Sequence, residues 1–361
     1  MPPEIVQFLL ELLRLIITIV AELLLYAADF GLQFILLITF VALVGLFLAP
    51  FETVRWWVRQ QENTSATAEQ IPQQVQGVEQ FQHALVQSRA DAVLVYLSGI
   101  GDPSGDYEAP NEVLFLDQLQ ARLPTTLIIR DVFAFSVTKR GLEKSTALGH
   151  VWSWLNEQKS SRSRTAVLGQ IINLRNLMQV LVSADYRYGP IYSYGIAEII
   201  VRFMLQRGYQ LGSGVPVILL GYSGGGQVAL GAARYIASTV RAPVWVISMG
   251  GVLSSDPGLN YIHKLYHVYG ERDNVHTLGE RVFPGRWFIS RKSFWNIAKR
   301  EGRIIMMNIG PIGHNGPNGY LDANATLPDG TRFLEKTLDT IETLANAMRA
   351  EAHAATSPSA A

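Results

Sequence analysis

The stretch VILLGYSGGGQVAL, residues 217 to 230, joins an apolar run to a serine among glycines and then to an alanine-containing, helix-like segment. The apolar run predicts a buried strand and the continuation predicts a helix. Between them GYSGG matches the pattern G-x-S-x-G. A serine on a tight strand-to-helix turn needs small residues two positions before and after it, because the backbones pass closely there. Gly221 and Gly225 meet this need, so we predict that Ser223 is a nucleophile.

The same glycines would also suit a phosphate-binding loop or a plain turn. No lysine follows them as in G-x-x-x-x-G-K-[ST], so a nucleotide loop is not supported. Gly224 begins the predicted helix, and its backbone N–H would point at a negative charge developing beside Ser223. A third glycine, Gly226, is not required by such a turn.

From about Val78 onward, strand-like runs alternate with helix-length segments, which predicts an α/β domain with a mostly parallel sheet covered on both faces. The predicted strands are 92–99, 125–133, 215–222, 242–250, 264–270 and 303–310, and the predicted helices are 111–122, 195–207, 227–239 and 332–349. The second and third strands lie about eighty residues apart, more than one crossover helix needs. Helix-like segments at 151–156 and 165–183 fall there. We expect a cap region over about 140–194, which either covers a binding cleft or adds packing helices.

A serine nucleophile needs a base, and the base needs an acid that orients it. His314 lies in GPIGHNGPNGY, directly after the last apolar strand. Asp273, in VYGERDNVH, follows the preceding strand in the same manner. Loops at the carboxyl ends of parallel strands are where such proteins place their chemistry. We predict His314 as the base and Asp273 as the acid, with Glu271 and Asp256 as fallback acids.

The chain order Ser223, Asp273, His314, with the serine in G-x-S-x-G, resembles the α/β-hydrolase superfamily over about residues 90 to 345. The resemblance implies an α/β-hydrolase fold, an acyl-serine intermediate, and an oxyanion hole completed by the loop after an early strand. That loop reads LSGIGDPSGD and lacks the histidine of the HGGG-type motif, which leaves its donor unassigned. Its candidates are Gly99, Ile100 and Gly101.

The N-terminal region is apolar and predicts a membrane anchor. Residues 31–49, GLQFILLITFVALVGLFLA, hold no charged residue and are long enough to cross a bilayer as a helix; a buried core helix rarely needs such a run. The segment before it carries a polar stripe on one helical face. It either spans beside the helix predicted at 31–49, in a hairpin turning at residues 29–31 with the stripe facing a partner helix, or lies in the interface. The stripe includes Glu4, Glu11, Arg14 and Glu22.

These features divide the chain into an anchor at 1–59 with one or two transmembrane helices, a polar linker at 60–77, a hydrolase domain at 78–350 and a disordered tail at 351–361. Arg55 and Arg59 follow the predicted span, and positive residues on that side favour a cytoplasmic catalytic domain.

Lys plus Arg and Asp plus Glu each number 30, and the resulting net charge of zero argues against a nucleic-acid partner. The chain has no cysteine, which excludes disulfides and a thiolate nucleophile. We predict no metal and no cofactor, since His263 and His267 read as strand residues rather than as a helical metal motif.

The sequence therefore predicts a membrane-anchored serine hydrolase acting on ester substrates, with lipids and other acyl esters first because the anchor holds the domain near a bilayer. An acyltransferase, a thioesterase or a peptidase would use the same residues. An inactive hydrolase-fold scaffold or partner-binding protein is the alternative outside the enzymes.

Overall fold

The structure, a computed structural model, describes residues 90–99, 109–132 and 180–356, together with Arg14, Thr18 and Gly31. The chain divides into two compact units, Met1–Ala49 and Pro50–Ala361. In the first unit the three described residues are helical, and the Thr18 hydroxyl donates to the Arg14 carbonyl at 3.0 Å. The turn expected at residues 29–31 is therefore not found at Gly31. A single glycine costs a helix only about 1 kcal/mol relative to alanine, so Gly31 by itself does not end one.

Among the described residues, no helix has the length and apolar character needed to cross a membrane. The predicted span at 31–49, apart from Gly31, and the linker at 60–77 lie outside those residues. Outside them too are the loop at 100–108 and the greater part of the cap region at 140–194.

The centre of the second unit is a six-stranded sheet with the order β2-β1-β3-β4-β5-β6, in which every neighbouring pair is parallel. This confirms the predicted α/β architecture. The sheet places β3, the strand that leads into Ser223, between β1 and β4. All residues of these three strands are buried, which explains their continuous apolar sequences. The strands are β1 (Ala92–Leu97), β2 (Thr126–Val132), β3 (Val217–Tyr222), β4 (Val244–Met249), β5 (Leu265–Tyr269) and β6 (Ile304–Asn308).

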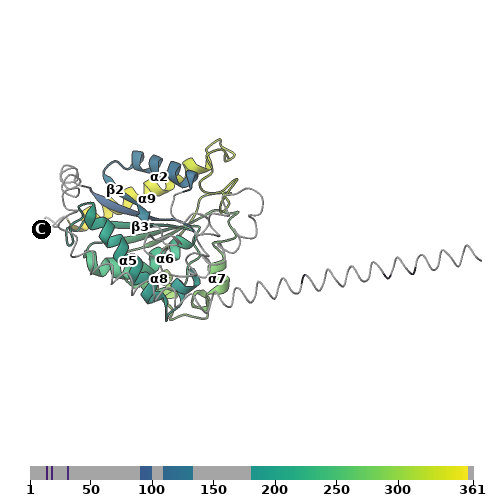
Figure 1. The fold of residues 1–361 in the computed structure, drawn as a ribbon, viewed down its shortest axis with the longest axis horizontal. Helices are drawn as coiled ribbons and strands as arrows, with labels where there is room; N and C mark the ends of the chain where they lie inside the picture. Colours follow the sequence, from purple (N-terminus) through teal and green to yellow (C-terminus); the bar gives the residue numbers. More distant parts are fainter. Residues whose placement is uncertain are drawn as a thin grey trace, which may run out of the picture. The chain divides into compact units, whose positions relative to one another are not determined.

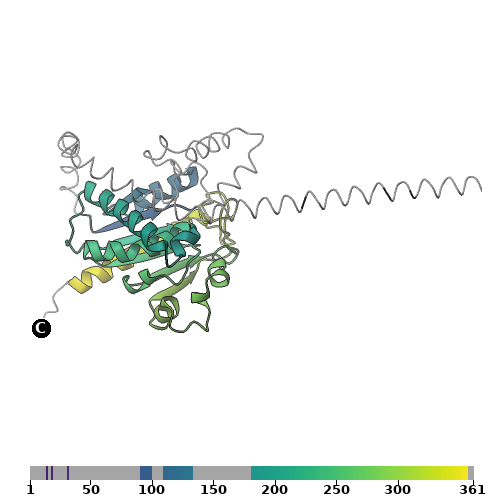
Figure 2. The same cartoon turned by 60° about the horizontal axis from the view of Figure 1, so that its bottom comes forward.

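Helices cover both faces of the sheet (Figure 1). On one face α5, α6 and α8 share a hydrophobic cluster with the strands, and on the other face α2 and α9 do so. The second view shows the same layers (Figure 2). The helices are α2 (Pro110–Arg122), α5 (Gly189–Gln206), α6 (Gly224–Val240), α7 (Leu278–Val282), α8 (Phe294–Arg300) and α9 (Phe333–Thr356), and two short 3₁₀ turns are Pro257–Asn260 and Pro284–Arg286.

Three helix boundaries differ from the sequence prediction by three or more residues. Helix α5 begins at Gly189 rather than Gly195, because Pro190 occupies its first turn, where proline is favourable. Helix α6 begins at Gly224, immediately after the serine, instead of Gln227. Helix α9 continues to Thr356 and so includes half of the tail expected to be disordered. That part is rich in alanine, and Ala352 is buried in the core, which extends the helix.

Residues 180–194, the described end of the cap region, pack against the sheet domain. Val180 and Tyr192 belong to the same hydrophobic cluster as α6, whereas Tyr186 is 85% exposed. The short helices α7 and α8, between β5 and β6, were not predicted from the sequence.

Candidate active site

Ser223 lies in a strained turn between β3 and α6. Its φ of 51° and ψ of −125° fall in a region that side-chain-bearing residues rarely adopt. The Ser223 N–H donates to the Met249 carbonyl at 2.9 Å, and the Ser223 carbonyl accepts from the Gly226 N–H at 3.0 Å. These bonds to β4 and α6 hold the turn.

The surrounding glycines are needed for space. A Cβ on Gly221 would lie 2.5 Å from the backbone of Gly225, and a Cβ on Gly225 would overlap the carbonyl oxygen of Leu97. Both elbow glycines therefore have the role that the sequence predicted. Gly226, which the turn itself does not require, has a packing role, because a Cβ there would lie 2.6 Å from the Ser248 Oγ. The absence of a Cβ at Gly226 lets α6 approach β4.

The structure brings the three predicted residues together. His314, in the loop after β6, has its Nε2 2.8 Å from the Ser223 Oγ. Its Nδ1 lies 3.0 Å from Oδ2 of Asp273, which follows β5. The Asp273 side chain is fully buried and the His314 side chain is 12% exposed. With the proton on Nδ1, the Nε2 lone pair faces the serine hydroxyl, which is the orientation a general base requires.

Asp273 is held as a carboxylate. Its Oδ2 accepts from the Tyr320 hydroxyl at 2.6 Å, and its Oδ1 accepts from the backbone N–H of Val275 at 2.8 Å. Burial by itself raises the pKa of Asp273, but the hydrogen bond and charge of His314 and the bonds from Tyr320 and Val275 outweigh it, so the pKa lies below its usual value. A buried negative charge beside His314 stabilises the imidazolium that proton transfer would form.

Two tyrosines complete the site, and sequence reasoning missed both. Tyr320 donates to Asp273 and accepts from the Gly270 N–H at 2.9 Å. The Tyr222 hydroxyl donates to the His314 carbonyl at 2.6 Å, and its ring stacks on the imidazole with centroids 5.6 Å apart. Burial raises the pKa of both phenols, which keeps them protonated as donors. Tyr320 stands at the end of the same GPIGHNGPNGY stretch as His314, and that closeness was its only signal.

Gly250, directly after β4, allows the acid and the base to meet. Its φ is +59°, and a Cβ there would lie 2.7 Å from the Asp273 Oδ2 and 3.1 Å from the His314 Nδ1. A side chain at this position would enter the hydrogen bond that orients the imidazole.

Of the residues predicted to donate hydrogen bonds to an oxyanion, Gly224 and Gly99 are among the described residues. Gly224 is the first residue of α6, where the backbone N–H groups have no partner within the helix and form the positive end of its dipole. A Cβ on Gly99 would lie 3.1 Å from the Cβ of Ser223, so the first residues after β1 lie beside the serine. Ile100 and Gly101 are outside the described residues.

The two fallback acids, Asp256 and Glu271, have hydrogen-bond partners other than His314. Asp256 accepts from the Gln227 amide at 3.1 Å and from the Gly258 N–H at 2.7 Å, and burial raises its pKa to about 6. Glu271 is exposed and accepts from Asn308 at 3.2 Å. The Nδ1 of His314 faces Asp273 instead of either of these carboxylates.

Metal ligands do not gather in the part of the chain that the structure describes, where no group of three or more suitable side chains is found. His267 is fully buried in β5, and His263 precedes that strand and stacks on Trp245 at 4.9 Å.

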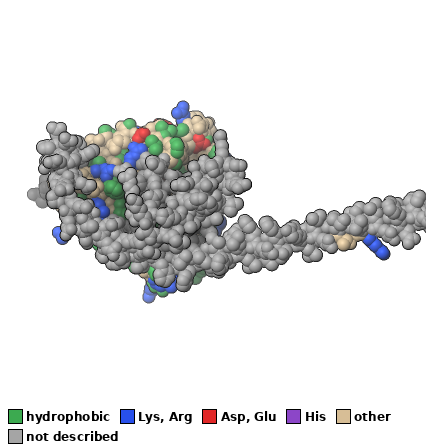
Figure 3. Space-filling view, in the orientation of Figure 1, with side chains coloured by type: hydrophobic (Ala, Val, Ile, Leu, Met, Phe, Trp, Pro, Cys, Tyr) green, Lys and Arg blue, Asp and Glu red, His purple; other side chains and the backbone are tan. Residues whose placement is uncertain are grey.

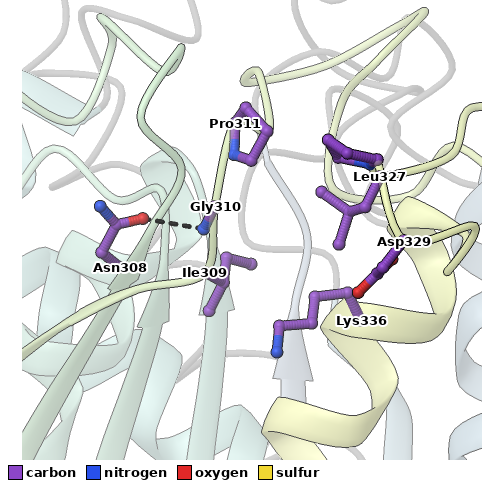
Figure 4. A pocket seen from close by; sticks show the side chains of 8 residues that line it. Asn308, Ile309, Gly310, Pro311, Leu327, Asp329 and Lys336 are labelled. Atoms are coloured by element: carbon purple, nitrogen blue, oxygen red, sulfur yellow. Dashed lines mark hydrogen bonds between the residues drawn. The ribbon is translucent and has the colours of Figure 1, made fainter.

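A pocket of about 380 Å³ opens near the end of β6 and contains none of Ser223, Asp273 and His314. Figure 4 shows the strand end with Gly310 on one side and Lys336 of α9 on the other. The lining residues are Asn308, Ile309, Gly310, Pro311, Leu327, Pro328, Asp329 and Lys336.

Replacing Tyr320 by phenylalanine tests how Asp273 is kept ionised. The variant loses a donor that lowers the pKa of Asp273, so the folded-state pKa moves back toward the unfolded value of about 3.9. A carboxylate with a depressed folded pKa stabilises the fold above that value, and this stabilisation is lost as the pH falls through the folded pKa. We expect Tyr320→Phe to lower the free energy of unfolding by its full amount at neutral pH and by a smaller amount below about pH 4. Urea unfolding at several pH values measures it.

Tyr209→Phe is the matched control, because the Tyr209 hydroxyl donates to the Val215 carbonyl at 2.9 Å, away from any carboxylate. Its effect on stability should not depend on acid pH. The same acid dependence in both variants would contradict the role of Tyr320.

No protein-family model matches the chain, and the search of curated proteins also found no match. Among solved structures the chain is similar to LpqC, a poly(3-hydroxybutyrate) depolymerase from Bordetella parapertussis, with 14% sequence identity and a TM-score of 0.34. The match covers 72% of this chain and 83% of that one. A likeness of this degree carries no argument about function, so we base the proposal on the site itself.

Proposed function

We propose that this protein is a serine hydrolase of the α/β-hydrolase type that cleaves esters through an acyl-serine intermediate. One observation carries the proposal: the Ser223 Oγ, the two ring nitrogens of His314 and the Asp273 Oδ2 form a continuous chain with steps of 2.8 and 3.0 Å. This series of hydrogen bonds starts at a serine on a strained turn and ends at a buried carboxylate. Both are conditions for an activated nucleophile.

The reaction would proceed in two halves. The Ser223 Oγ attacks the ester carbonyl carbon while His314 Nε2 takes the hydroxyl proton, and Asp273 stabilises the resulting imidazolium. The tetrahedral intermediate collapses, the alcohol leaves with the proton from His314, and an acyl-serine remains. Water then attacks the acyl carbon, its proton passes to His314, and the serine oxygen leaves with that proton to release the acid.

The negative oxygen of each tetrahedral intermediate needs donors in place before the reaction. The Gly224 N–H, at the positive end of α6, is the first, and we propose Ile100 or Gly101 for the second because Gly99 lies beside Ser223. One such donor contributes on the order of 10²- to 10³-fold to kcat.

An inactive scaffold would have no use for this alignment. A binding protein on the same fold needs the glycines for the turn, but it does not need a buried acid that points at the imidazole and a tyrosine that points at the acid. The hydrogen bond of 2.6 Å between Tyr320 and Asp273 therefore favours an enzyme.

The substrate class follows from the predicted anchor. We propose that residues 31–49 hold the domain at a bilayer and that its substrates are lipid or other acyl esters, since tethering raises the local concentration of membrane substrates. Arg55 and Arg59 support a domain that faces the cytoplasm.

A fluorophosphonate probe tests the proposal directly, because a serine oxygen attacks its phosphorus and displaces fluoride only when a base activates it. We expect wild-type full-length protein to be labelled at Ser223, as mapped by peptide mass spectrometry, and His314→Ala to lose labelling about 10³-fold or more in rate.

His263→Ala is the matched histidine control and should be labelled at the wild-type rate, since His263 stacks on Trp245 outside the site. A folded wild type that is not labelled, or a label on another residue, would overturn the proposed mechanism.

A further inference from the structure

The chain segment that joins β5 to β6 contains α7 and α8 and carries an apolar surface patch. Phe288 is 86% exposed and Ile289 is 65% exposed, and neighbouring apolar side chains are exposed with them. Soluble proteins rarely leave consecutive large apolar side chains in water without a partner. We call this set the 288 patch: Leu278, Val282, Trp287, Phe288, Ile289 and Phe294.

The backbone beneath the 288 patch is held in place. The Asn296 amide donates to the carbonyls of Trp287 at 2.8 Å and Ser290 at 3.1 Å. The Trp287 indole donates to the Glu280 carbonyl at 2.9 Å. Arg286 is buried, lies 3.8 Å from the centre of the Trp295 ring and donates to the Leu253 carbonyl at 3.2 Å. The loop is thus bonded in a shape that keeps its apolar tip in solvent, instead of folding the tip inward.

Charge around the 288 patch is strongly positive. Residues 278–303 contain seven Arg and Lys against two Glu, in a chain whose net charge is zero. Both acids are paired with arginines inside the segment, Glu280 with Arg286 at 2.9 Å and Glu301 with Arg303 at 2.6 Å. The side chains that stay exposed include Arg281, Arg291, Lys292, Lys299 and Arg300.

Another face of the domain shows the contrast. In Figure 3 the visible described surface over α2 and α9 mixes hydrophobic, basic and acidic side chains. There Arg122 pairs with Glu335, Asp339 and Glu342 of α9. The positive excess at 278–303 is therefore local.

We infer that the 288 patch docks on the surface of an anionic lipid bilayer. Aromatic and aliphatic tips surrounded by basic side chains suit such a surface, since the tips enter the boundary between headgroups and acyl chains and the cations meet lipid phosphates and carboxylates. Trp287 has the amphipathic ring typical of that depth. The segment begins shortly after Asp273 and lies at one end of the domain, where α7 and α8 are drawn in Figure 2. Docking would hold the active-site edge at the membrane, and it does not depend on the proposed chemistry.

The chain has no cysteine, so a fluorophore attaches at the introduced cysteine alone. Full-length Phe288→Cys, labelled with an environment-sensitive fluorophore, is mixed or reconstituted with phosphatidylcholine vesicles with or without phosphatidylserine. We expect a blue shift and quenching by acyl-chain spin labels in the anionic vesicles. Leu211→Cys, at a side chain that is 49% exposed outside the patch, is the matched control and should not be quenched.

Two charge substitutions test the electrostatic part. In the Phe288→Cys background, Arg291→Gln with Lys292→Gln should lower the ratio of docked to undocked label on the order of thirtyfold, and high salt should also lower it. A label at 288 that is never quenched in anionic vesicles would overturn the inference. So would a label that becomes buried without lipid as protein concentration rises, because the occupant would then be a second copy of the chain. Fluorophosphonate labelling of Ser223 is read separately, so the failure of docking and the failure of the proposed chemistry are distinguishable.

Discussion

Replacing Ser223 by alanine is expected to lower kcat for ester hydrolysis by about 10⁴- to 10⁶-fold. The Oγ is the only atom removed, and in the proposed mechanism it is the atom that forms the covalent bond. Alanine keeps the Cβ, so the strained backbone of φ 51° and the packing of Gly221 against Gly225 are unchanged. The loss should appear in kcat measured with a soluble chromogenic ester, and the thermal unfolding temperature should change little.

Ser238→Ala, on the helix α6 that follows Ser223, is the matched control. The Ser238 hydroxyl bonds only locally, to the Arg234 carbonyl at 2.8 Å, so its removal should leave hydrolysis at the wild-type rate. Hydrolysis that persists in Ser223→Ala would show that the esterase activity does not pass through this serine.

Replacing Asp273 by asparagine is expected to lower kcat about 10⁴-fold while the site keeps its shape. The asparagine amide would place an N–H where the carboxylate now accepts from His314 Nδ1 at 3.0 Å. The imidazole would then keep its proton on Nε2, and that nitrogen would have no lone pair for the Ser223 hydroxyl. The variant would also lose the negative charge that stabilises the imidazolium. Steady-state kinetics and the fluorophosphonate labelling rate should fall together.

Asp256→Asn separates this effect from the general cost of altering a buried acid. Asp256 is also buried, but it accepts its hydrogen bonds from Gln227 and Gly258. Its substitution should lower stability and leave the chemistry near the wild-type rate. If the two variants lost kcat equally, the assignment of Asp273 as the acid would be contradicted.

The positions of the strands and of the serine turn followed from local sequence alone. All six predicted strands are present, with no end shifted by more than two residues, because buried parallel strands have continuous apolar sequences. The turn was predictable because close approach of backbones leaves only glycine at 221 and 225, and that demand acts within a few residues.

Other features depended on side chains that meet across the fold. Asp273 and Asp256 both follow strands, and only the arrangement of β5 beside β6 brings one of them to His314. The partner of the Tyr320 hydroxyl, the space left by Gly250 and the exposure of Phe288 are likewise relations between distant segments.

The sequence by itself thus determined the strands of the parallel sheet and the glycine turn, since each rests on residue pattern or backbone space within a short stretch. It placed the candidate acid and base only in loops that follow strands. The tertiary structure decided which acid faces the base, which tyrosine holds that acid and which apolar side chains remain in water. Hydrogen bonds and burial between segments far apart in the chain leave no local pattern by which they can be read.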